Sequence, residues 1–333
     1  MMPSLYIGGR YSNSPMRHKS SNKEDLRQFL EKQGRKIVSD AHEADIYIAL
    51  DHNEKEEKSL IERRRLKKYS ILYRSEPFCV LPTAYKPATI ALYSSIFSFG
   101  KSEILNDGKH WPQYFPGKEQ SGWGNHDRSP RAVLINANKL SLSPSELYSL
   151  RRESIKKIEG IDLFGENWNS NFKDRLKILA IEVMKDPMAN LVSFMGHSRH
   201  WFSNWPETPS PADKLQTMQS YKFAFVIENE LTYMSEKLFD AFFAGCIPVY
   251  VGPDVADYGI PKGLVIQCKP TVKSLIEGFE VAKRKNFEDY QEQLEKWLKS
   301  DSTKNSHEGV GVINRAIEST FKKYSEFTKA NQL

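Results

Sequence analysis

The sequence lacks the features of membrane-spanning, secreted and disulfide-stabilised proteins. Its 333 residues include three cysteines, Cys79, Cys246 and Cys268, and each lies in an apolar run. An odd and widely spaced set of this kind predicts reduced, buried thiols. No segment approaches the roughly 20 consecutive apolar residues that a membrane-spanning helix needs. The first 15 residues also lack the apolar core of a signal peptide. We therefore expect a cytoplasmic protein.

Patterns typical of metal-binding and nucleic-acid-binding proteins are also absent. No CxxC, HxxxH or paired-acid spacing predicts a structural metal. The net charge of +6, from 48 basic and 42 acidic residues, suits an anionic ligand or an anionic membrane face. We interpret the basic runs at 62–68 and 283–285 as solvated helix faces, because no nucleic-acid-binding motif accompanies them. We therefore expect neither a bound metal nor a nucleic-acid partner.

Short apolar runs alternate with charged, helix-like stretches over the first 105 or so residues. The pattern predicts strands at 5–7, 44–50 and 70–73, and helices at 23–34 and 54–68. Strands and helices in turn indicate a parallel sheet. The last of these strands ends in Arg74-Ser75-Glu76-Pro77, and the proline favours an extended backbone at the glutamate.

A segment rich in glycine and proline, residues 106–130, interrupts this alternation. It carries four aromatic residues, Trp111, Tyr114, Phe115 and Trp123. A flexible linker seldom contains so many aromatics, so we interpret the segment as an ordered interdomain connection. The chain is therefore expected to divide into an N-terminal domain at 1–128, a C-terminal domain at 129–310 and a helical segment at 311–333.

The second half of the chain repeats the alternation of strands and helices. It predicts strands at 132–136, 161–165 and 264–267, helices at 143–159 and 172–185, and an irregular loop at 195–213. Ser143 and Glu146 form a predicted capping box at the start of the first of these helices, with Pro144 between them. Two α/β modules predict a ligand site in a cleft between two domains.

Residues 221–253 are the most informative segment, because a strand passes there into a polar loop and a helix. The pattern predicts a strand at 223–227, an N-cap at Ser235 and a helix stop at Gly245. Glu236 and Lys237 then fall in the first helical turn, where backbone N–H groups and the lysine favour an anion such as a diphosphate. Glu236 would repel a phosphate, so a sugar or ribose hydroxyl suits it better. The alternative is a capped amphipathic helix with an incidental Glu–Lys pair.

The letters YKFAFVIENELTYMSEKLFDAFFAGCIPVYVG, at 221–252, resemble the signature of α1,3/4-fucosyltransferases, glycosyltransferase family 10. Weaker agreement at ILYRSEP, LINANKLSLSPSELYSLRR and IDLFG extends the resemblance over about 70–270. The resemblance implies the GT-B architecture, an α/β fold of two Rossmann-like domains with a cleft between them. It also implies inverting transfer of L-fucose from GDP-β-L-fucose to a glycan hydroxyl, with neither metal nor cofactor.

The resemblance also implies roles for individual residues. Asn229, Tyr233, Glu236 and Lys237 match donor-contacting positions, with Lys237 facing the diphosphate and Glu236 holding ribose or fucose hydroxyls. Ser235 stands where the family usually has threonine and keeps the hydroxyl. Glu76 matches the family's proposed catalytic base, and its alternative is a carboxylate in a surface turn. The second cation beside the phosphate is expected to be Lys214 or Arg199.

Two departures from the family pattern leave other functions open. Glu230 stands where serine is common, and the loop before Tyr233 is short. The alternatives are a transferase for another nucleotide sugar and a non-catalytic glycan-binding protein on the same fold. The expected acceptor is a glycan or glycolipid, either lipopolysaccharide/O-antigen or N-acetyllactosamine-like, met at the inner face of a bacterial membrane. Basic stretches at 273–285 and 321–329 would suit peripheral membrane contact, and ordinary surface helices are the alternative.

Overall fold

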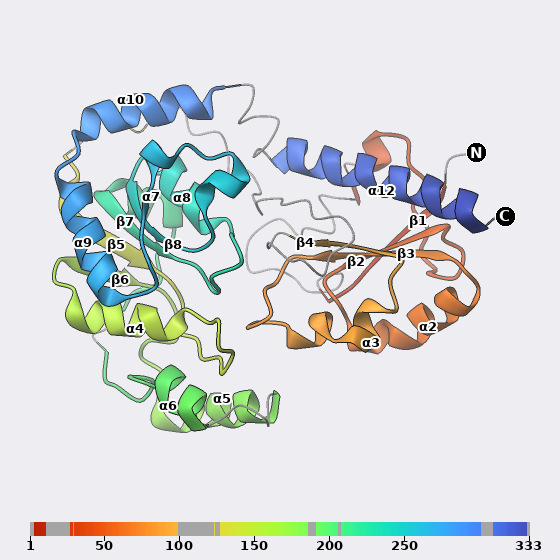
Figure 1. Ribbon diagram of the computed structural model, residues 1–333, viewed down its shortest axis with the longest axis horizontal. Helices are drawn as coiled ribbons and strands as arrows, with labels where there is room; N and C mark the ends of the chain where they lie inside the picture. The colour runs from red at the N-terminus through yellow and green to blue at the C-terminus, as the bar shows by residue number, and fades with distance from the viewer. Residues whose placement is uncertain are drawn as a thin grey trace. The chain divides into compact units, whose positions relative to one another are not determined.

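The computed structural model describes residues 3–10, 27–28, 30–98, 123, 127–185, 191–205, 208–300 and 309–331. The chain divides into two compact units. The first unit combines Met1–Trp111 with Gly309–Leu333, and the second is Pro112–Glu308. Each unit is built around a parallel sheet with helices on both faces (Figure 1).

The sheet of the first unit has the strand order β1-β2-β3-β4. Its strands are β1 (Leu5–Gly8), β2 (Ile46–Leu50), β3 (Tyr69–Arg74) and β4 (Ser95–Ser98). The α-helices of this unit whose bounds lie within the described residues are α2 (Glu57–Arg65), α3 (Pro87–Ile90) and α12 (Gly309–Asn331). Ile37 forms an isolated parallel bridge with Leu5, which also pairs with Ile46 of β2. Ile37 therefore lies along one edge of β1, and the chain then crosses to form β2 along the other edge.

Successive side chains of β3 point to opposite faces of this sheet, as in any β-strand. The ring of Tyr69 packs against Tyr324 and Phe327 of α12, at centroid distances of 5.7 and 5.2 Å. Leu72 instead joins the apolar cluster that contains Leu60 of α2. The C-terminal helix thus covers one face and α2 the other (Figure 1).

The sheet of the second unit has the order β6-β5-β7-β8-β9, and its pairs are parallel. Its strands are β5 (Ser129–Ile135), β6 (Ile161–Phe164), β7 (Tyr221–Ile227), β8 (Ile247–Val251) and β9 (Ile266–Gln267). Its α-helices are α4 (Tyr148–Lys157), α5 (Phe172–Lys185), α6 (Leu191–His197), α7 (Lys214–Gln219), α8 (Lys237–Phe243), α9 (Val272–Lys283) and α10 (Phe287–Leu298). The chain reverses its direction across the sheet between β5 and β7. Open α/β sheets bind ligands outside the carboxyl ends of the strands at such a point.

The core of the second unit lies around β7 and β8, which pair from Phe223 opposite Ile247 to Ile227 opposite Val251. Every residue of β8 is buried. On one face of the sheet, Phe223 and Phe225 contact Phe279 of α9. On the other face lies α8, whose buried residues include Leu238 and Phe242. Burial on both faces explains why these strands are continuous apolar runs.

The predicted strands are confirmed to within two residues at each end, except that β5 begins at Ser129, three residues before the predicted start, and the strand predicted at 264–267 keeps only half its length. There Leu264 belongs to a 3-10 turn, Lys262–Leu264, and the strand is reduced to Ile266–Gln267. The helix predicted at 172–185 has those bounds. The loop predicted at 195–213 is wrong at its start, because Met195 to His197 complete α6. The three cysteines are buried and free, as predicted.

The helix predicted at 143–159 is wrong at its start, because α4 begins at Tyr148. The carboxylate of Glu146 accepts hydrogen bonds from the backbone N–H groups of Tyr148 and Ser149, at 2.5 and 3.0 Å. These are donors that the first turn of a helix leaves unsatisfied. Glu146 therefore caps α4 from outside it, and Ser143 is not the N-cap.

Two predictions fall largely on residues outside the described ranges. Of the helix expected at 23–34, the structure describes 27–28 and 30–34, and 27–28 and 30–32 are helical. Of the aromatics in the predicted connection, Trp123 is described, and its Nε1 donates to the carbonyl of Phe243 at 2.8 Å. Trp111, Tyr114 and Phe115 lie outside the described residues.

No helix in the described part of the chain is both long enough and apolar enough to span a membrane.

Candidate functional site

The carboxyl end of β7 lies beside the loop that follows β5. Leu147 donates its backbone N–H to the carbonyl of Asn229 at 3.0 Å. The buried guanidinium of Arg151 donates to the carbonyl of Ile227 at 2.6 and 3.1 Å, and to Asn229 Oδ1 at 3.0 Å. Arg151 therefore fixes both the end of the strand and the orientation of the Asn229 amide. These contacts place Asn229 at the point where the sheet order reverses.

A buried carboxylate organises the loop between β7 and α8. Glu228 is fully buried, and its two oxygens accept the backbone N–H and the hydroxyl of Ser235 at 2.9 and 2.6 Å. The Nζ of Lys237 donates to the Ser235 hydroxyl at 2.8 Å and lies 3.5 Å from the Glu228 carboxylate. The Lys237 side chain is 15% exposed. The ammonium is thus held in one place by two partners while part of it still reaches solvent.

The start of α8 differs from the predicted one. The helix begins at Lys237 and its N-cap is Glu236, so Ser235 is not the N-cap. The hydroxyl of Ser235 donates to Glu228 and accepts the backbone N–H of Lys237 at 3.4 Å, from one residue before the cap position. Because α8 has seven residues, its aligned peptide dipoles are few, and the positive charge at this end resides mainly in lysine side chains.

Lysines from three segments act on the carboxylate of Glu236. Burial raises the pKa of Glu236, but Lys237 and Lys214 outweigh it and hold the pKa below its ordinary value, with a smaller contribution from Lys139. Lys214, the first residue of α7, donates to Asp240 Oδ2. Burial raises the pKa of Asp240 above its ordinary value, against the opposing charge of Lys214. The site is therefore a compact set of alternating charges in which the three lysines are suited to a polyanion.

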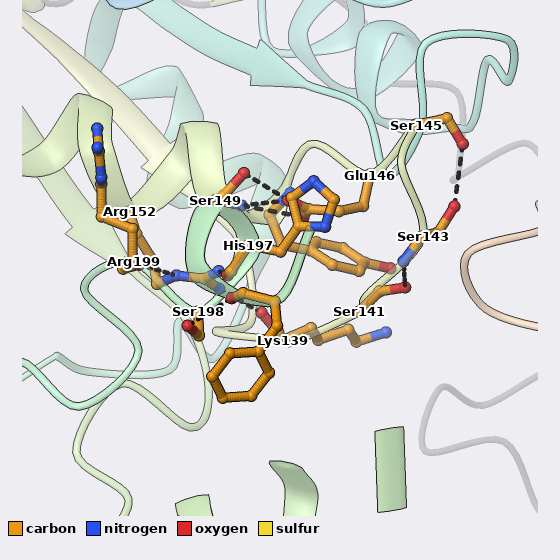
Figure 2. Close-up of polar contacts among 12 residues, drawn as sticks. Lys139, Ser141, Ser143, Ser145, Glu146, Ser149, Arg152, His197, Ser198 and Arg199 are labelled. Atoms are coloured by element: carbon orange, nitrogen blue, oxygen red, sulfur yellow. Dashed lines mark hydrogen bonds and ion pairs between the residues drawn. The ribbon is translucent and has the colours of Figure 1, made fainter. Parts of the chain in front are cut away.

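Arg199, the other candidate cation, lies on α4's side of the unit. Its side chain is 62% exposed and pairs with Glu153 of α4 at 3.5 Å. Its neighbour in space, Arg152, is fully buried and donates to the carbonyls of Lys139, His197 and Arg199 (Figure 2). Arg152 therefore ties the loop after β5 to the segment after α6. Of the two candidate cations, the structure brings Lys214 into contact with α8.

Tyr233 and Glu230 are both buried in the loop before α8. Tyr233 is 3% exposed, and its backbone N–H donates to the carbonyl of Glu230 at 3.4 Å. Glu230 accepts a hydrogen bond from the hydroxyl of Thr232 at 3.0 Å. The carboxylate of Glu230 therefore helps to shape the loop and does not simply face water.

A buried amide lies at the carboxyl end of β5. Asn138 is 2% exposed, and neither polar atom of its side chain has a hydrogen-bond partner among the residues that the structure describes. Most buried side-chain amides in proteins are hydrogen-bonded. An unpaired amide at the reversal point of the sheet favours a polar ligand there.

Glu76 lies at the corresponding edge of the first unit, just beyond the carboxyl end of β3. Its backbone N–H donates to Asp51 Oδ1 at 3.2 Å, and its carbonyl accepts a hydrogen bond from Tyr85 Oη at 2.9 Å. Asp51 follows β2 directly and is fully buried. Burial raises the pKa of Asp51 to about 7; the nearby Glu76 carboxylate also raises it, and hydrogen bonds from Ser75 and Glu76 oppose the rise.

The raised pKa of Asp51 predicts a pH-dependent contribution to stability. The native pKa lies above the unfolded value of 3.8, so the contribution is full below that value and falls as pH rises through about 7. Asp51→Asn removes this titration. The melting temperature of the unaltered protein, minus that of the variant, should therefore decrease between about pH 4 and pH 8. Thermal unfolding across this range at constant ionic strength measures it, and a constant difference contradicts it. The Glu76 carboxyl and the Tyr93 hydroxyl are the titratable neighbours.

Sequence reasoning missed several residues that build the site. Glu228 directly follows β7, and a carboxylate at the end of a buried strand is itself a signal, since an unpaired charge there is costly. Asp51 carries the same signal after β2. Lys139 and Arg151 were missed because nothing in their local sequence shows that their segments meet the loop after β7. No group of histidine, cysteine and acidic residues that could hold a metal occurs in the described part of the chain.

Comparison with known proteins shows similarity in sequence over a short segment and similarity in fold over most of the chain. The chain is 43% identical over 67 residues to alpha-(1,3)-fucosyltransferase 4 of Mus musculus, a match that covers 18% of this chain and 16% of the mouse protein. The crystal structure of Anabaena HepE in complex with UDP and glucose aligns with a TM-score of 0.51 and 10% identity, over 96% of this chain and 99% of that one. A crystal structure of an α1,3-fucosyltransferase aligns over 90% of each chain, with a TM-score of 0.48 and 11% identity. No family model matches the chain.

The fold is that of GT-B glycosyltransferases, which have two Rossmann-like domains. The predicted α/β fold class is confirmed. The local identity to the mouse protein confirms the resemblance to α1,3-fucosyltransferases that residues 221–252 indicate.

Proposed function

We propose that this chain is an inverting glycosyltransferase that moves L-fucose from GDP-β-L-fucose to a hydroxyl of a glycan acceptor. The observation that carries the proposal is the 228–237 loop. Its fucosyltransferase-like sequence lies at the reversal point of a GT-B sheet, where Lys237 and Lys214 act on Glu236. The local identity to a fucosyltransferase supports the choice of sugar.

In the proposed reaction the acceptor oxygen attacks the anomeric carbon of fucose. A new C–O bond forms there, and the bond from that carbon to the β-phosphate oxygen breaks, so GDP leaves with the electron pair. Lys237 and Lys214 would stabilise the charge that develops on the leaving diphosphate. Glu76 would take the proton of the acceptor hydroxyl as general base. Glu236 would bind a hydroxyl of the ribose or fucose, and Asn229 and Tyr233 would shape the donor pocket.

A transfer assay tests this proposal. The purified protein is incubated with GDP-fucose and either N-acetyllactosamine or a lipopolysaccharide core oligosaccharide, and products are identified by mass spectrometry. We expect a fucosylated product and one GDP released per transfer, with the same rate in the presence of EDTA. Boiled protein and GDP-mannose are the controls. GDP-fucose binding without any transfer would instead support a non-catalytic glycan-binding protein.

A transferase for a different nucleotide sugar is the second candidate, and Glu230 favours it. This buried carboxylate lies in the donor loop, where a serine is common in the family that the loop resembles. A bound donor raises the melting temperature by mass action, so a thermal-shift panel of GDP, UDP and dTDP sugars separates the two candidates. The acceptor class and a peripheral contact with the inner face of a bacterial membrane stay predictions.

A further inference from the structure

Among the residues that the structure describes, the carboxylate of Asp51 accepts three hydrogen bonds, all from Ser75 and Glu76. Oδ1 accepts the backbone N–H groups of Ser75 and Glu76, at 2.8 and 3.2 Å. Oδ2 accepts the hydroxyl of Ser75. Asp51 is fully buried, and burying a carboxylate is costly unless hydrogen bonds compensate. The buried carboxylate, with its desolvation cost, thus lies against the segment that carries the proposed base, Glu76.

The backbone of Asp51 is itself fixed from both neighbouring strands. Its N–H donates to the carbonyl of Tyr73 in β3 at 2.9 Å, and its carbonyl accepts from Arg10, just beyond β1, at 3.1 Å. Gly9 packs so closely here that an added Cβ would lie 2.6 Å from the Asp51 carbonyl oxygen. Asp51 adopts a positive φ of 57°, a conformation that aspartate tolerates better than most residues. The carboxylate therefore projects from a rigid point.

The Glu76 backbone is consequently held on both sides. Asp51 accepts its N–H, and Tyr85 Oη donates to its carbonyl at 2.9 Å. A general base must lie within hydrogen-bond reach of the proton that it removes, and a displacement of about 1 Å can slow a reaction roughly a hundredfold. Rigid placement of this backbone is what a base at Glu76 requires.

We propose that Asp51 is a positioning residue for Glu76, acting through the Ser75–Glu76 backbone and the Ser75 hydroxyl. This inference rests on the proposed function, in which Glu76 is the base. Asp51 acts on the transfer step through Glu76 and is assigned no contact with donor or acceptor.

A double-mutant cycle between Asp51→Asn and Glu76→Gln tests the inference. In the cycle, kcat for transfer from GDP-fucose to N-acetyllactosamine is measured by mass spectrometry, alongside the KM for GDP-fucose. Asp51→Asn alone should lower kcat by roughly 10–100-fold and leave that KM unchanged. In the Glu76→Gln background the same change should alter the residual rate by less than about twofold, because residues that act as a unit are not additive. A purely structural role would lower kcat equally in both backgrounds and overturn the inference.

Three further variants keep the test decisive if Asp51→Asn folds poorly. Ser75→Ala removes one of the three bonds and should lower kcat by a smaller factor, whereas Ser75→Thr keeps the hydroxyl and should restore it. Asp45→Asn is the matched control, because Asp45 accepts the backbone N–H and the hydroxyl of Ser4 just before the amino end of β2, whereas Asp51 follows its carboxyl end. Loss of activity in Glu76→Gln but not in Asp51→Asn or Ser75→Ala overturns this inference alone. Absence of transfer by the unaltered protein removes the proposed function, and this role with it.

Discussion

Replacing Glu76 by glutamine is expected to lower kcat for fucosyl transfer by a factor of about 10²–10⁴, the usual contribution of a general base. Glutamine keeps the size of the side chain and the backbone bonds to Asp51 and Tyr85, so the melting temperature should stay close to that of the unaltered protein. GDP binding, measured by calorimetry, should also be unchanged, since the proposed donor contacts lie in the second unit. Full activity in this variant would contradict the role of Glu76 as general base and would favour the alternative, a carboxylate in a surface turn.

Replacing Lys237 by methionine is expected to lower the transfer rate by about 10²–10³, the usual loss when one group that stabilises developing charge is removed. The affinity for GDP should fall as well, because the ammonium would no longer face the diphosphate. The change also leaves the buried Glu228 carboxylate without its cation, which should reduce the free energy of unfolding by roughly 1–3 kcal/mol. Calorimetry with GDP and chemical denaturation measure the two effects separately.

The double variant Glu228→Gln/Lys237→Met separates the role of Lys237 in binding from its role in stability. It removes both charges of the buried pair, so most of the lost stability should return. GDP affinity should remain low, since no lysine stands at the start of α8. Lys283→Ala is the matched control, because Lys283 pairs with Glu280 on the exposed face of α9 in the same unit. Unaltered GDP affinity in Lys237→Met would contradict the phosphate-binding role.

The sheets were predictable from sequence because their strands are strongly patterned. β8 is apolar throughout and β7 is apolar from Phe223 to Ile227, since both faces are covered there, and the polar residues that follow β7 mark its carboxyl end. The resemblance of 221–252 to a known signature then located the candidate site. The start of the helix at 172–185 was predictable because it is set locally: Asn171 Oδ1 accepts the backbone N–H of Asp174 at 2.9 Å.

The starts of α4 and α8 were not predictable, because a glutamate outside each helix holds the segment where that helix begins. A capping box at Ser143 and an N-cap at Ser235 are both reasonable from local sequence. In the fold, Glu146 binds the N–H groups at the start of α4, and Glu228 binds the Ser235 hydroxyl. Glu228 lies seven residues upstream of Ser235, and it reaches the serine because the loop after β7 folds back. Contacts of this kind are decided by tertiary structure.

The gathering of three lysines around Glu236 could likewise not be predicted from the local sequence. Lys139, Lys214 and Lys237 come from three segments that meet because the chain reverses its direction across the sheet between β5 and β7. Sequence separation gives no measure of such proximity. The family resemblance supplied Lys237 directly and Lys214 as one of two candidates, and it gave no reason to single out Lys139.

The order of synthesis sets the order in which the two units can be completed. α12 leaves the ribosome after every element of the second unit, yet Tyr324 and Phe327 of this helix cover Tyr69 on β3 of the first unit. A nascent chain therefore contains every element of the second unit while the side of β3 that α12 covers is still exposed. Domains fold as units during synthesis, and exposed apolar surface makes incomplete ones prone to aggregate. Ribosomes that stall before residue 309 should release chains whose N-terminal sheet is the part that chaperones must shield.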